Sequence, residues 1–324
     1  MNPHSSQHNQ GASSATHAHP KVVCIMGPTA SGKTALAIEL AKQIDGEVIS
    51  VDSALIYKDM DIGTAKPDAD EMQGIEHHLI DILTPDLPYS VADFYKDAVE
   101  CIEKIHNKGK TPILAGGTMM YFNALHHGIS DIPGSNYEVR QNVQQMIENE
   151  GLEQVHSKLA QVDPQSAARI HPNDPQRITR AMEVYLSTGK SLTSWQNQKR
   201  PSLPYQFINV ALMTENRAYL HQRIALRFQQ MVEKGLISEV KHILKTYKVN
   251  PDLPSMRSVG YRQVIQHLAG EFDESLMIER GIIATRQLAK RQITWLRGWE
   301  NTQILDIEST NNLELLLQKI CVTE

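Results

Sequence analysis

The stretch CIMGPTASGKTALAIEL, Cys24–Leu40, decides the fold because it joins three kinds of local structure. It begins inside a β-branched run, VVCIM, and ends in apolar residues at helical spacing, TALAIEL. Between them, Gly27, Gly32, Lys33 and Thr34 match the phosphate-loop pattern GxxxxGK[ST], which composition alone would produce with a probability of roughly 1%. The loop N–H groups hold an anion, Lys33 reaches phosphate oxygens, and Thr34 suits Mg²⁺. The sequence therefore predicts a phosphate site, but the loop pattern alone does not identify the ligand that carries the phosphate.

Further strands and helices alternate on both sides of this stretch. The segments EVISVDS, HHLIDIL, TPILAGGT, YQFINVALM and TQILDI are expected strands, and VADFYKDAVECIEKIHNKG is a helix that ends near Gly109. This alternation predicts an α/β fold of the P-loop NTPase type, with a parallel sheet flanked by helices. We expect a disordered N-terminal tail at 1–20, a core formed by 21–129 and 206–324, and a helical insertion domain at 130–205.

Composition limits the classes of function. The chain has 324 residues, a net charge of -5 and a pI near 6.3, which argues against binding nucleic acid by bulk positive charge. Its three cysteines are far apart and indicate neither a disulfide framework nor a zinc site. Because no apolar run has the length of a membrane span and the N-terminus lacks a signal-peptide core, we expect a cytoplasmic protein that does not enter membranes.

Two acidic residues on or directly after expected strands are candidates for a role near the phosphate loop. Asp52 comes after EVISV, and Asp81 lies within HLIDIL. Asp52 is the better candidate because substrates bind at the carboxyl ends of parallel strands. An aspartate so placed also suits a small-molecule kinase, in which it would deprotonate the hydroxyl that attacks ATP, so nucleotide binding stays open at this point.

Several segments together resemble one family. GPTASGKT, VDSALIYKDMDIGTAKP, GGTMMYFNAL, HPNDPQR, RSVGYRQ and ATRQLAKRQITWLRGW are similar to those of tRNA dimethylallyltransferases in their bacterial form, from about Lys21 to Glu300. The resemblance implies transfer of a dimethylallyl group from dimethylallyl diphosphate to N6 of the adenosine 3′ of the anticodon, with Mg²⁺ as cofactor and the tRNA anticodon stem-loop as partner. We take a monomer as the default. Asp59 departs from the family pattern, since a glycine is expected there.

The resemblance assigns the reaction to a small set of residues. It makes Asp52 the base that accepts the amine proton, and the Thr29 hydroxyl a donor to the oxygen bridging carbon and phosphorus. Thr34 is the metal ligand. The expected diphosphate contacts are Gly27, Pro28, Thr29, Ala30, Ser31, Gly32, Lys33, Thr34 and Arg223.

The expected tRNA contacts come from four segments and two single residues. A target base in folded RNA must leave its stack to reach a prenyl donor. In TRQLAKRQITWLRG, moreover, four cations occur without an acid, and Arg286, Lys290 and Arg297 fall within about 40° on one helix edge. By resemblance the contacts are Asp52, Ser53, Ala54, Leu55, Thr118, Arg140, Gln176, Arg177, Ile178, Thr179, Arg180, Arg257, Ser258, Val259, Gly260, Tyr261, Arg262, Lys290, Arg291, Gln292, Ile293, Thr294, Trp295, Leu296 and Arg297.

Three alternatives to a tRNA prenyl transferase stay open at this level. A small-molecule kinase explains the phosphate loop and Asp52 but leaves the arginine-bearing segments without use. A prenyl transferase acting on free adenine nucleotide would need neither the insertion nor the basic helix edge. An RNA-binding module with a vestigial loop is disfavoured by the intact set of Gly32, Lys33, Thr34 and Asp52.

Overall fold

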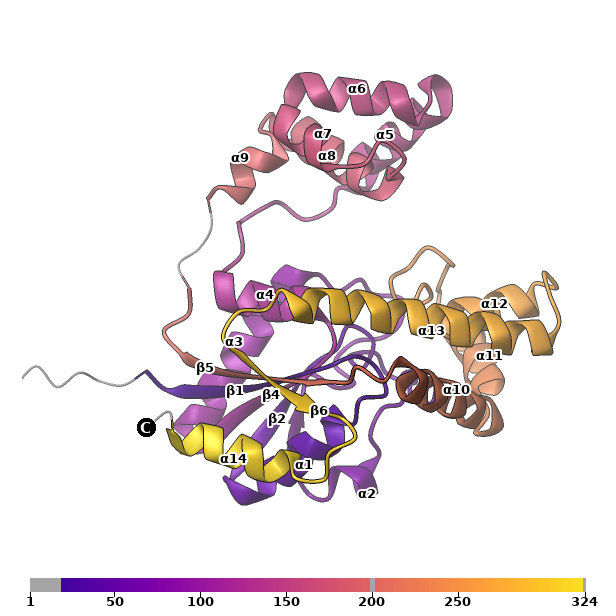
Figure 1. Ribbon diagram of the computed structural model, residues 1–324. Coiled ribbons are helices and arrows are strands. Elements are labelled where there is room, and N and C mark those ends of the chain that lie inside the picture. The colour runs from indigo at the N-terminus through magenta and orange to yellow at the C-terminus, as the bar shows by residue number, and fades with distance from the viewer. Residues whose placement is uncertain (1–18, 199–201, 323–324) are drawn as a thin grey trace, which may run out of the picture.

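A computed structural model describes residues 19–198 and 202–322, and its centre is one sheet (Figure 1). Six strands pair in the order β3-β2-β4-β1-β5-β6, and every pairing is parallel. The strands are β1 (Lys21–Met26), β2 (Gly46–Val51), β3 (His77–His78), β4 (Thr111–Gly116), β5 (Gln206–Met213) and β6 (Thr302–Asp306). The predicted α/β class with a parallel sheet is confirmed. The expected tail at 1–20 lies outside the described residues except for its last two positions.

Helices cover both faces of the sheet. Phe94 and Phe122 pack with Cys24 and Ile49 on one face, where α3 and α4 lie, and Leu40 and Leu316 bring α1 and α14 to the other. Within the described chain, the core helices are α1 (Lys33–Gln43), α2 (Ala69–Met72), α3 (Val91–Asn107), α4 (Met119–His127), α10 (Arg217–Glu233), α11 (Leu236–Thr246), α12 (Tyr261–Leu268), α13 (Glu274–Arg297) and α14 (Asn312–Val322). None of the described helices combines the length and the apolar character that a membrane span requires.

Strand register brings the ends of three strands together. Met26 of β1 pairs with Gly116 of β4, and Gly116 pairs with Val51 of β2. The residues that follow these strand ends therefore leave the sheet at one level, side by side. These residues begin the phosphate loop at Gly27, the segment at Asp52, and the turn into α4.

The predicted strand HHLIDIL is wrong beyond its first two residues. Only His77–His78 pairs with β2, and Leu79 and Asp81 have φ of 60° and 54°, in the left-handed region. Asp81 bonds instead to the amine of Lys66, whose side chain is buried. An apolar run of this length does not distinguish a strand from a buried loop by periodicity alone.

Asp59, the departure from the family pattern, occupies a position that favours glycine. Its φ is 61°, and its carboxylate accepts a hydrogen bond from the hydroxyl of Tyr247. Aspartate is one of the few non-glycine residues that adopt this conformation readily. Aspartate therefore forms the left-handed turn in place of the expected glycine, and its carboxylate adds the hydrogen bond from Tyr247.

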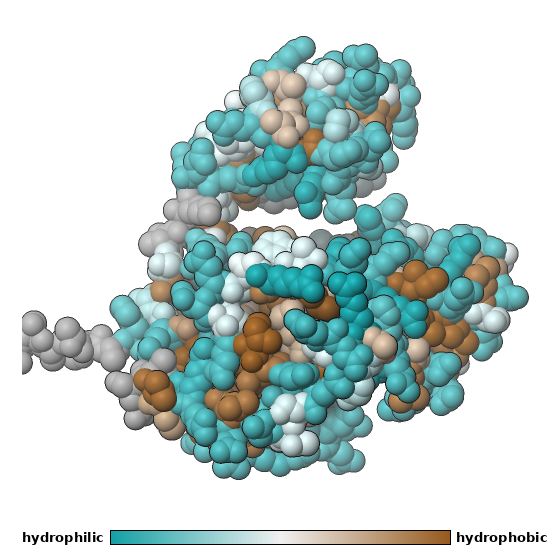
Figure 2. All heavy atoms as spheres, in the orientation of Figure 1, coloured by the Kyte–Doolittle hydropathy of each residue, from teal (hydrophilic) through white to brown (hydrophobic). Residues whose placement is uncertain are grey.

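Five helices lie between α4 and β5, within the segment expected to be an insertion domain. They are α5 (Tyr137–Glu150), α6 (Leu152–Val162), α7 (Pro164–Arg169), α8 (Pro175–Thr188) and α9 (Leu192–Gln196). Asp163 and Asp174 cap α7 and α8, each directly ahead of a proline at the first position of the helix. Val143, Leu159 and Met182 belong to an apolar cluster formed within these helices. Figure 2 shows a mostly hydrophilic surface on this group and a hollow between it and the core.

The long helix α13 crosses the core against α10 at a close contact. A Cβ atom on Gly281 would lie 2.0 Å from the ring of Phe228, a separation that no real contact tolerates. Phe228 is 3% exposed and belongs to the cluster that joins α10 to α11 and α13. Gly281 thus sets how closely α13 approaches the rest of the core.

We expect Gly281→Ala to lower the free energy of unfolding by about 1–2 kcal/mol, because overpacking outweighs the gain in helix propensity. Gly298→Ala is the matched control: a Cβ there would meet its nearest atom, the Trp295 carbonyl oxygen, at an ordinary 3.7 Å. Urea unfolding of the two variants measures the difference. Equal stability of the two would contradict close packing at Gly281.

Candidate active site

A cavity of about 520 Å³ opens where β1, β2 and β4 end. Residues from the phosphate loop, from the segment after β2, from the start of α4, and from α10 and α13 all border it. Among its lining residues are sixteen of the predicted ones: Thr29, Ala30, Lys33, Thr34, Asp52, Ser53, Ala54, Leu55, Thr118, Arg257, Ser258, Val259, Tyr261, Arg291, Gln292 and Trp295. Residues up to 266 positions apart in the sequence (Thr29 to Trp295) are thus assembled around one space.

The phosphate loop has the backbone that anion binding requires. Gly32 has φ 90° and Ala30 has φ 63°, so the chain turns sharply before α1 begins at Lys33. No side chain caps the start of α1. Its free N–H groups and positive dipole end therefore face the cavity, where an anion would satisfy both.

Three charged side chains meet at this loop. Burial lowers the pKa of the Lys33 amine to about 8, partly opposed by the charge of Asp52 and assisted by that of Arg227. Burial also lowers the pKa of the Arg227 guanidinium, and Asp52 again opposes the shift. Two cations and one carboxylate leave the site with a positive excess, which suits a diphosphate.

Arg227 is a site residue that the sequence reasoning missed. It lies four residues after Arg223 on α10, so the two share a helix face. Arg223 donates from Nε to the Ala30 carbonyl at 2.8 Å and so braces the loop, whereas Arg227 lines the cavity itself. The spacing of the two arginines was the available signal.

A second cavity of about 790 Å³ lies on the other side of the loop. Gly32 and Arg223 line this second cavity, and both cavities border Lys33, Thr34 and Arg227. The cationic groups therefore lie between two openings, one toward α13 and one toward α2 and the outer side of α10.

The segment after β2 is held in a defined turn. The Ala54 N–H donates to Asp52 Oδ1 at 2.9 Å, and the Ser53 N–H donates to Thr118 Oγ1 at 3.1 Å. Because Thr118 begins α4, this bond ties the ends of β2 and β4 together. The carboxylate of Asp52 is thereby fixed at the cavity wall while remaining only half-buried.

The opposite wall depends on one carboxylate. Glu239 of α11 accepts hydrogen bonds from the N–H groups of Asp61, Ile62 and Gly63 at 3.0, 2.6 and 3.0 Å. It also accepts one from the hydroxyl of Tyr261 at 2.6 Å. Glu239 thus joins the segment before α2 to the segment 257–261, and both line the cavity.

The remaining predicted residues fall outside this cavity. In the helical insertion, Ile178 and Thr179 are buried, Gln176 and Arg177 are exposed, and Arg180 donates to the Pro133 carbonyl at 2.6 Å. Arg140 lies 3.8 Å from the buried Glu183. The other predicted residues that do not line the cavity are Gly27, Pro28, Ser31, Gly32, Arg223, Gly260, Arg262, Lys290, Ile293, Thr294, Leu296 and Arg297.

On α13, exposure separates the predicted residues. Leu296 is buried in the core, whereas Lys290 and Arg297 are exposed away from the cavity. Trp295 is 47% exposed and lines the cavity. This tryptophan has an aromatic face available to a ligand.

The donor set at the loop fits Mg²⁺. Thr34 lines both cavities and presents a hydroxyl oxygen beside the anion site. Hydroxyl and diphosphate oxygens are the hard ligands that Mg²⁺ prefers. Thr34 would hold the ion together with the diphosphate.

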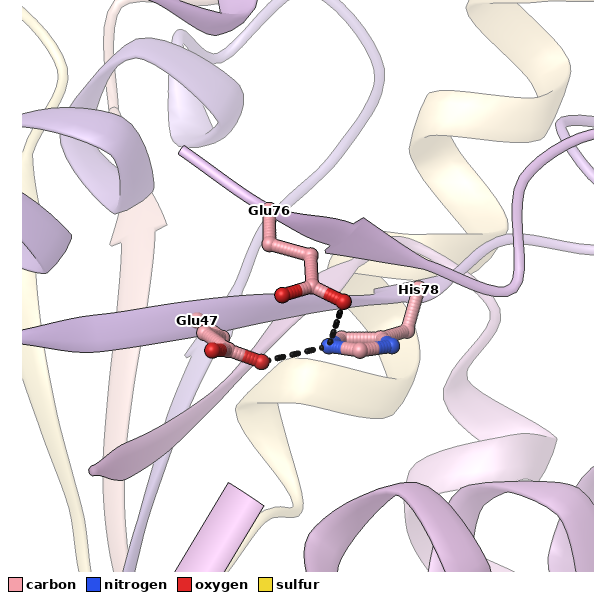
Figure 3. Close-up of side chains that lie close together, drawn as sticks. All are labelled: Glu47, Glu76 and His78. Carbon is pink, nitrogen blue, oxygen red and sulfur yellow. Dashed lines mark hydrogen bonds and ion pairs between the residues drawn. The ribbon is translucent and has the colours of Figure 1, made fainter. Parts of the chain in front are cut away.

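A different cluster with metal-ligand chemistry lies at the opposite end of the sheet (Figure 3). Among the described residues, Glu47, Glu76 and His78 bring ligand atoms within 4.8 Å of one another. However, Glu47 Oε2 accepts from His78 Nε2 at 2.8 Å and from the Lys108 amine at 2.9 Å, and Glu47 Oε1 lies 3.1 Å from the Lys110 amine. The lysines already balance the carboxylate charge, so this cluster is an ion-pair network around the buried Glu47 that joins the starts of β2, β3 and β4.

Comparison with known proteins agrees with this geometry. Residues 55–299 match the family model described as IPP transferase. Over 291 residues, covering 90% of this chain and 94% of the relative, the protein is 50% identical to the tRNA dimethylallyltransferase of Coxiella burnetii (strain RSA 331 / Henzerling II). The chain belongs to the tRNA dimethylallyltransferase family.

Solved structures of this family share the fold. The full-length tRNA isopentenylpyrophosphate transferase of Bacillus halodurans is 37% identical, with a TM-score of 0.67 over 94% of this chain and 95% of that one. A eukaryotic dimethylallyltransferase acting on tRNA is 29% identical, with a TM-score of 0.78 over 94% of this chain and 78% of that one. Family membership favours prenyl transfer over the kinase alternative.

The ion-pair network in Figure 3 generates a stability prediction. Burial by itself would raise the pKa of Glu47, but hydrogen bonds from Lys108, His78 and Lys110 lower it to about 2. Because the folded-state pKa is depressed, the stabilisation is complete above the unfolded value and is lost as the pH falls toward 2. We expect Glu47→Gln to lower the free energy of unfolding at pH 7 by about 3 kcal/mol.

Urea unfolding of wild type and Glu47→Gln between pH 7 and pH 3 measures this effect. The difference between them should narrow once the pH drops below about 4.5, where the unfolded carboxyl takes up its proton. Glu76→Gln is the control, because Glu76 is 55% exposed and its pairing should contribute under about 1 kcal/mol. A difference that stays constant with pH would contradict the role of the Glu47 charge.

Proposed function

We propose that this protein transfers a dimethylallyl group from dimethylallyl diphosphate to N6 of the adenosine at position 37 of tRNA, next to the anticodon. The observation that carries the proposal is the single cavity at which a phosphate loop and the carboxylate of Asp52 meet. Family membership supplies the substrate pair. The two substrates would enter from the two cavities that border Lys33, Thr34 and Arg227.

The cationic groups act on the leaving group. Breaking the allylic carbon–oxygen bond leaves positive character on the prenyl carbon and negative charge on diphosphate. Lys33, Arg227 and the N–H groups at the start of α1 stabilise that negative charge in a site that is partly withdrawn from water. Mg²⁺, when bound through Thr34, would neutralise further charge on the diphosphate oxygens.

Asp52 acts on the amine that forms the new C–N bond, and Thr29 acts on the oxygen of the C–O bond that breaks. The exocyclic amine of adenine is a weak nucleophile and must lose a proton as the new C–N bond forms, and Asp52 at the cavity wall accepts it. The Thr29 hydroxyl donates to the oxygen that leaves carbon. Both residues line the same cavity, as this assignment requires.

The surfaces around the cavity mouth suit RNA. Arg257 and Arg291 are exposed and line the cavity, and Trp295 offers an aromatic face for a neighbouring base. The exposed Arg177 lies on α8 of the helical insertion, and Figure 2 shows a hollow between that group of helices and the core. We propose that the anticodon stem-loop lies between core and insertion and places an unstacked adenine in the cavity.

The test supplies the purified protein and Mg²⁺ with a tRNA transcript that has adenosine 3′ of its anticodon. One reaction contains labelled dimethylallyl diphosphate and the other γ-labelled ATP. Label should enter RNA only from the prenyl donor. Transfer of phosphate from ATP to a small acceptor, without label in RNA, would establish the kinase alternative instead.

We expect Asp52→Asn to reduce turnover by about 100-fold or more, the range for loss of a general base, while tRNA affinity stays unchanged. Asparagine retains an oxygen to accept from the Ala54 N–H, so the local turn survives. The control is Asp45→Asn, at the other end of β2, where the side chain is 81% exposed. Single-turnover rates and tRNA binding measure both. Near-normal turnover in Asp52→Asn would mean that another group is the base.

A further inference from the structure

Gln292 connects three segments that border the cavity. Its side chain lies on α13 and is 8% exposed. The Thr29 N–H donates to Gln292 Oε1 at 2.9 Å, and Gln292 Nε2 donates to the Gly117 carbonyl at 2.9 Å. One amide therefore joins α13, the phosphate loop and the end of β4.

The surroundings of Gln292 leave little freedom for this arrangement. A Cβ on Gly117 would lie 2.3 Å from Gln292 Nε2 and 3.1 Å from the Gly27 carbonyl oxygen. Glycine at position 117 thus permits the amide and the first turn of the loop to approach the same backbone. Because a buried amide that loses a partner incurs a desolvation cost, both of its bonds hold the side chain in place.

Both polar ends of Gln292 are used inside the protein, which distinguishes it from its neighbours on α13. Arg291 and Trp295 line the cavity and are exposed, so they can reach a ligand. Oε1 and Nε2 of Gln292 each make one bond inside the protein, and the side chain is buried, so little of it is left for a contact with RNA. Its burial and bonding therefore point to a role within the site, in place of the RNA contact that the family resemblance implied.

We propose that Gln292 is a positioning residue that sets the place of Thr29 in the phosphate loop, and that α13 thereby sets the loop geometry for prenyl transfer. This inference rests on the proposed function, in which the Thr29 hydroxyl donates to the leaving oxygen. Holding the Thr29 peptide N–H fixes the backbone from which that hydroxyl extends. A displacement of about 1 Å at such a group can cost on the order of 100-fold in rate.

The test uses Gln292→Glu, because the two side chains match in shape and differ in one proton. A protonated glutamic acid accepts from Thr29 with its carbonyl oxygen and donates its O–H to Gly117, as the amide does. An ionised carboxylate has no donor for Gly117. Burial raises the pKa of such a carboxyl by as much as 3–5 units, which moves its titration toward neutral pH.

The measurement is the single-turnover rate with saturating tRNA and dimethylallyl diphosphate, divided by the wild-type rate at each pH between about 6 and 9. The division removes the titration of the cavity groups that both proteins share, namely Lys33, Asp52, Arg227, Arg257, Tyr261 and Arg291. At the highest pH we expect Gln292→Glu to react about 100-fold more slowly than wild type. At the lowest pH its rate should recover to within a few-fold of wild type, and its tRNA affinity should stay unchanged at every pH.

Two further variants separate the possible causes. Gln292→Met removes both bonds without a titrating group and should stay slow at every pH. Gln287→Glu places the same negative charge on an exposed position of α13 and controls for repulsion between that charge and RNA. Its rate relative to wild type should not recover as the pH falls.

Weaker tRNA binding by Gln292→Glu at an unchanged rate would overturn the proposal and restore Gln292 as an RNA contact. Equal rates for Gln292→Met and wild type would also overturn it. Activity of the wild type in the same assay tests the proposed function separately.

Discussion

The parallel pairing of β1, β2 and β4 is the constraint on which the site depends. In register, Met26, Val51 and Gly116 end their strands at one level, so the phosphate loop, Asp52 and the start of α4 leave the sheet side by side. Hydrogen bonds then hold these three segments together. The Ser53 N–H donates to the Thr118 hydroxyl, and the Gln292 amide joins the Thr29 N–H to the Gly117 carbonyl. A shift of register by one residue would move Asp52 along the sheet and turn its side chain to the other face.

The second requirement is a wall that closes the space above the strand ends. Gly281 lets α13 lie directly on Phe228 of α10, and Glu239 holds the segment 61–63 against Tyr261. These contacts involve no group assigned to the reaction, yet they decide how far the wall stands from the loop. The cavity is consequently a product of helix packing as well as of the sheet.

Much of this arrangement was predictable from the sequence, because local patterns decide it. The pattern around Lys33 specified strand, loop and helix together, and the alternation that followed predicted a parallel sheet. The prediction of a strand at HHLIDIL was wrong beyond His78. The left-handed backbone at Leu79 and Asp81 that ends the strand cannot be recognised from the hydropathy pattern. Contacts between distant segments, such as Gln292 with Thr29, have no periodicity and were beyond prediction. Arg227 could have been predicted as a site residue, because it follows Arg223 by four positions on the same helix.

The distribution of charge explains how a protein of net charge -5 can handle two polyanions. Four cations border the cavity: Lys33 and Arg227 at the loop, and Arg257 and Arg291 at the cavity mouth. Asp52 is the one carboxylate among the described residues that line this cavity, and it opposes the lowering of the Lys33 pKa. With a pKa of about 8, the Lys33 amine is largely charged at neutral pH, and a bound diphosphate would favour that charge further. The carboxylate that we propose as the base thus also helps to keep the proposed diphosphate site cationic before the donor arrives.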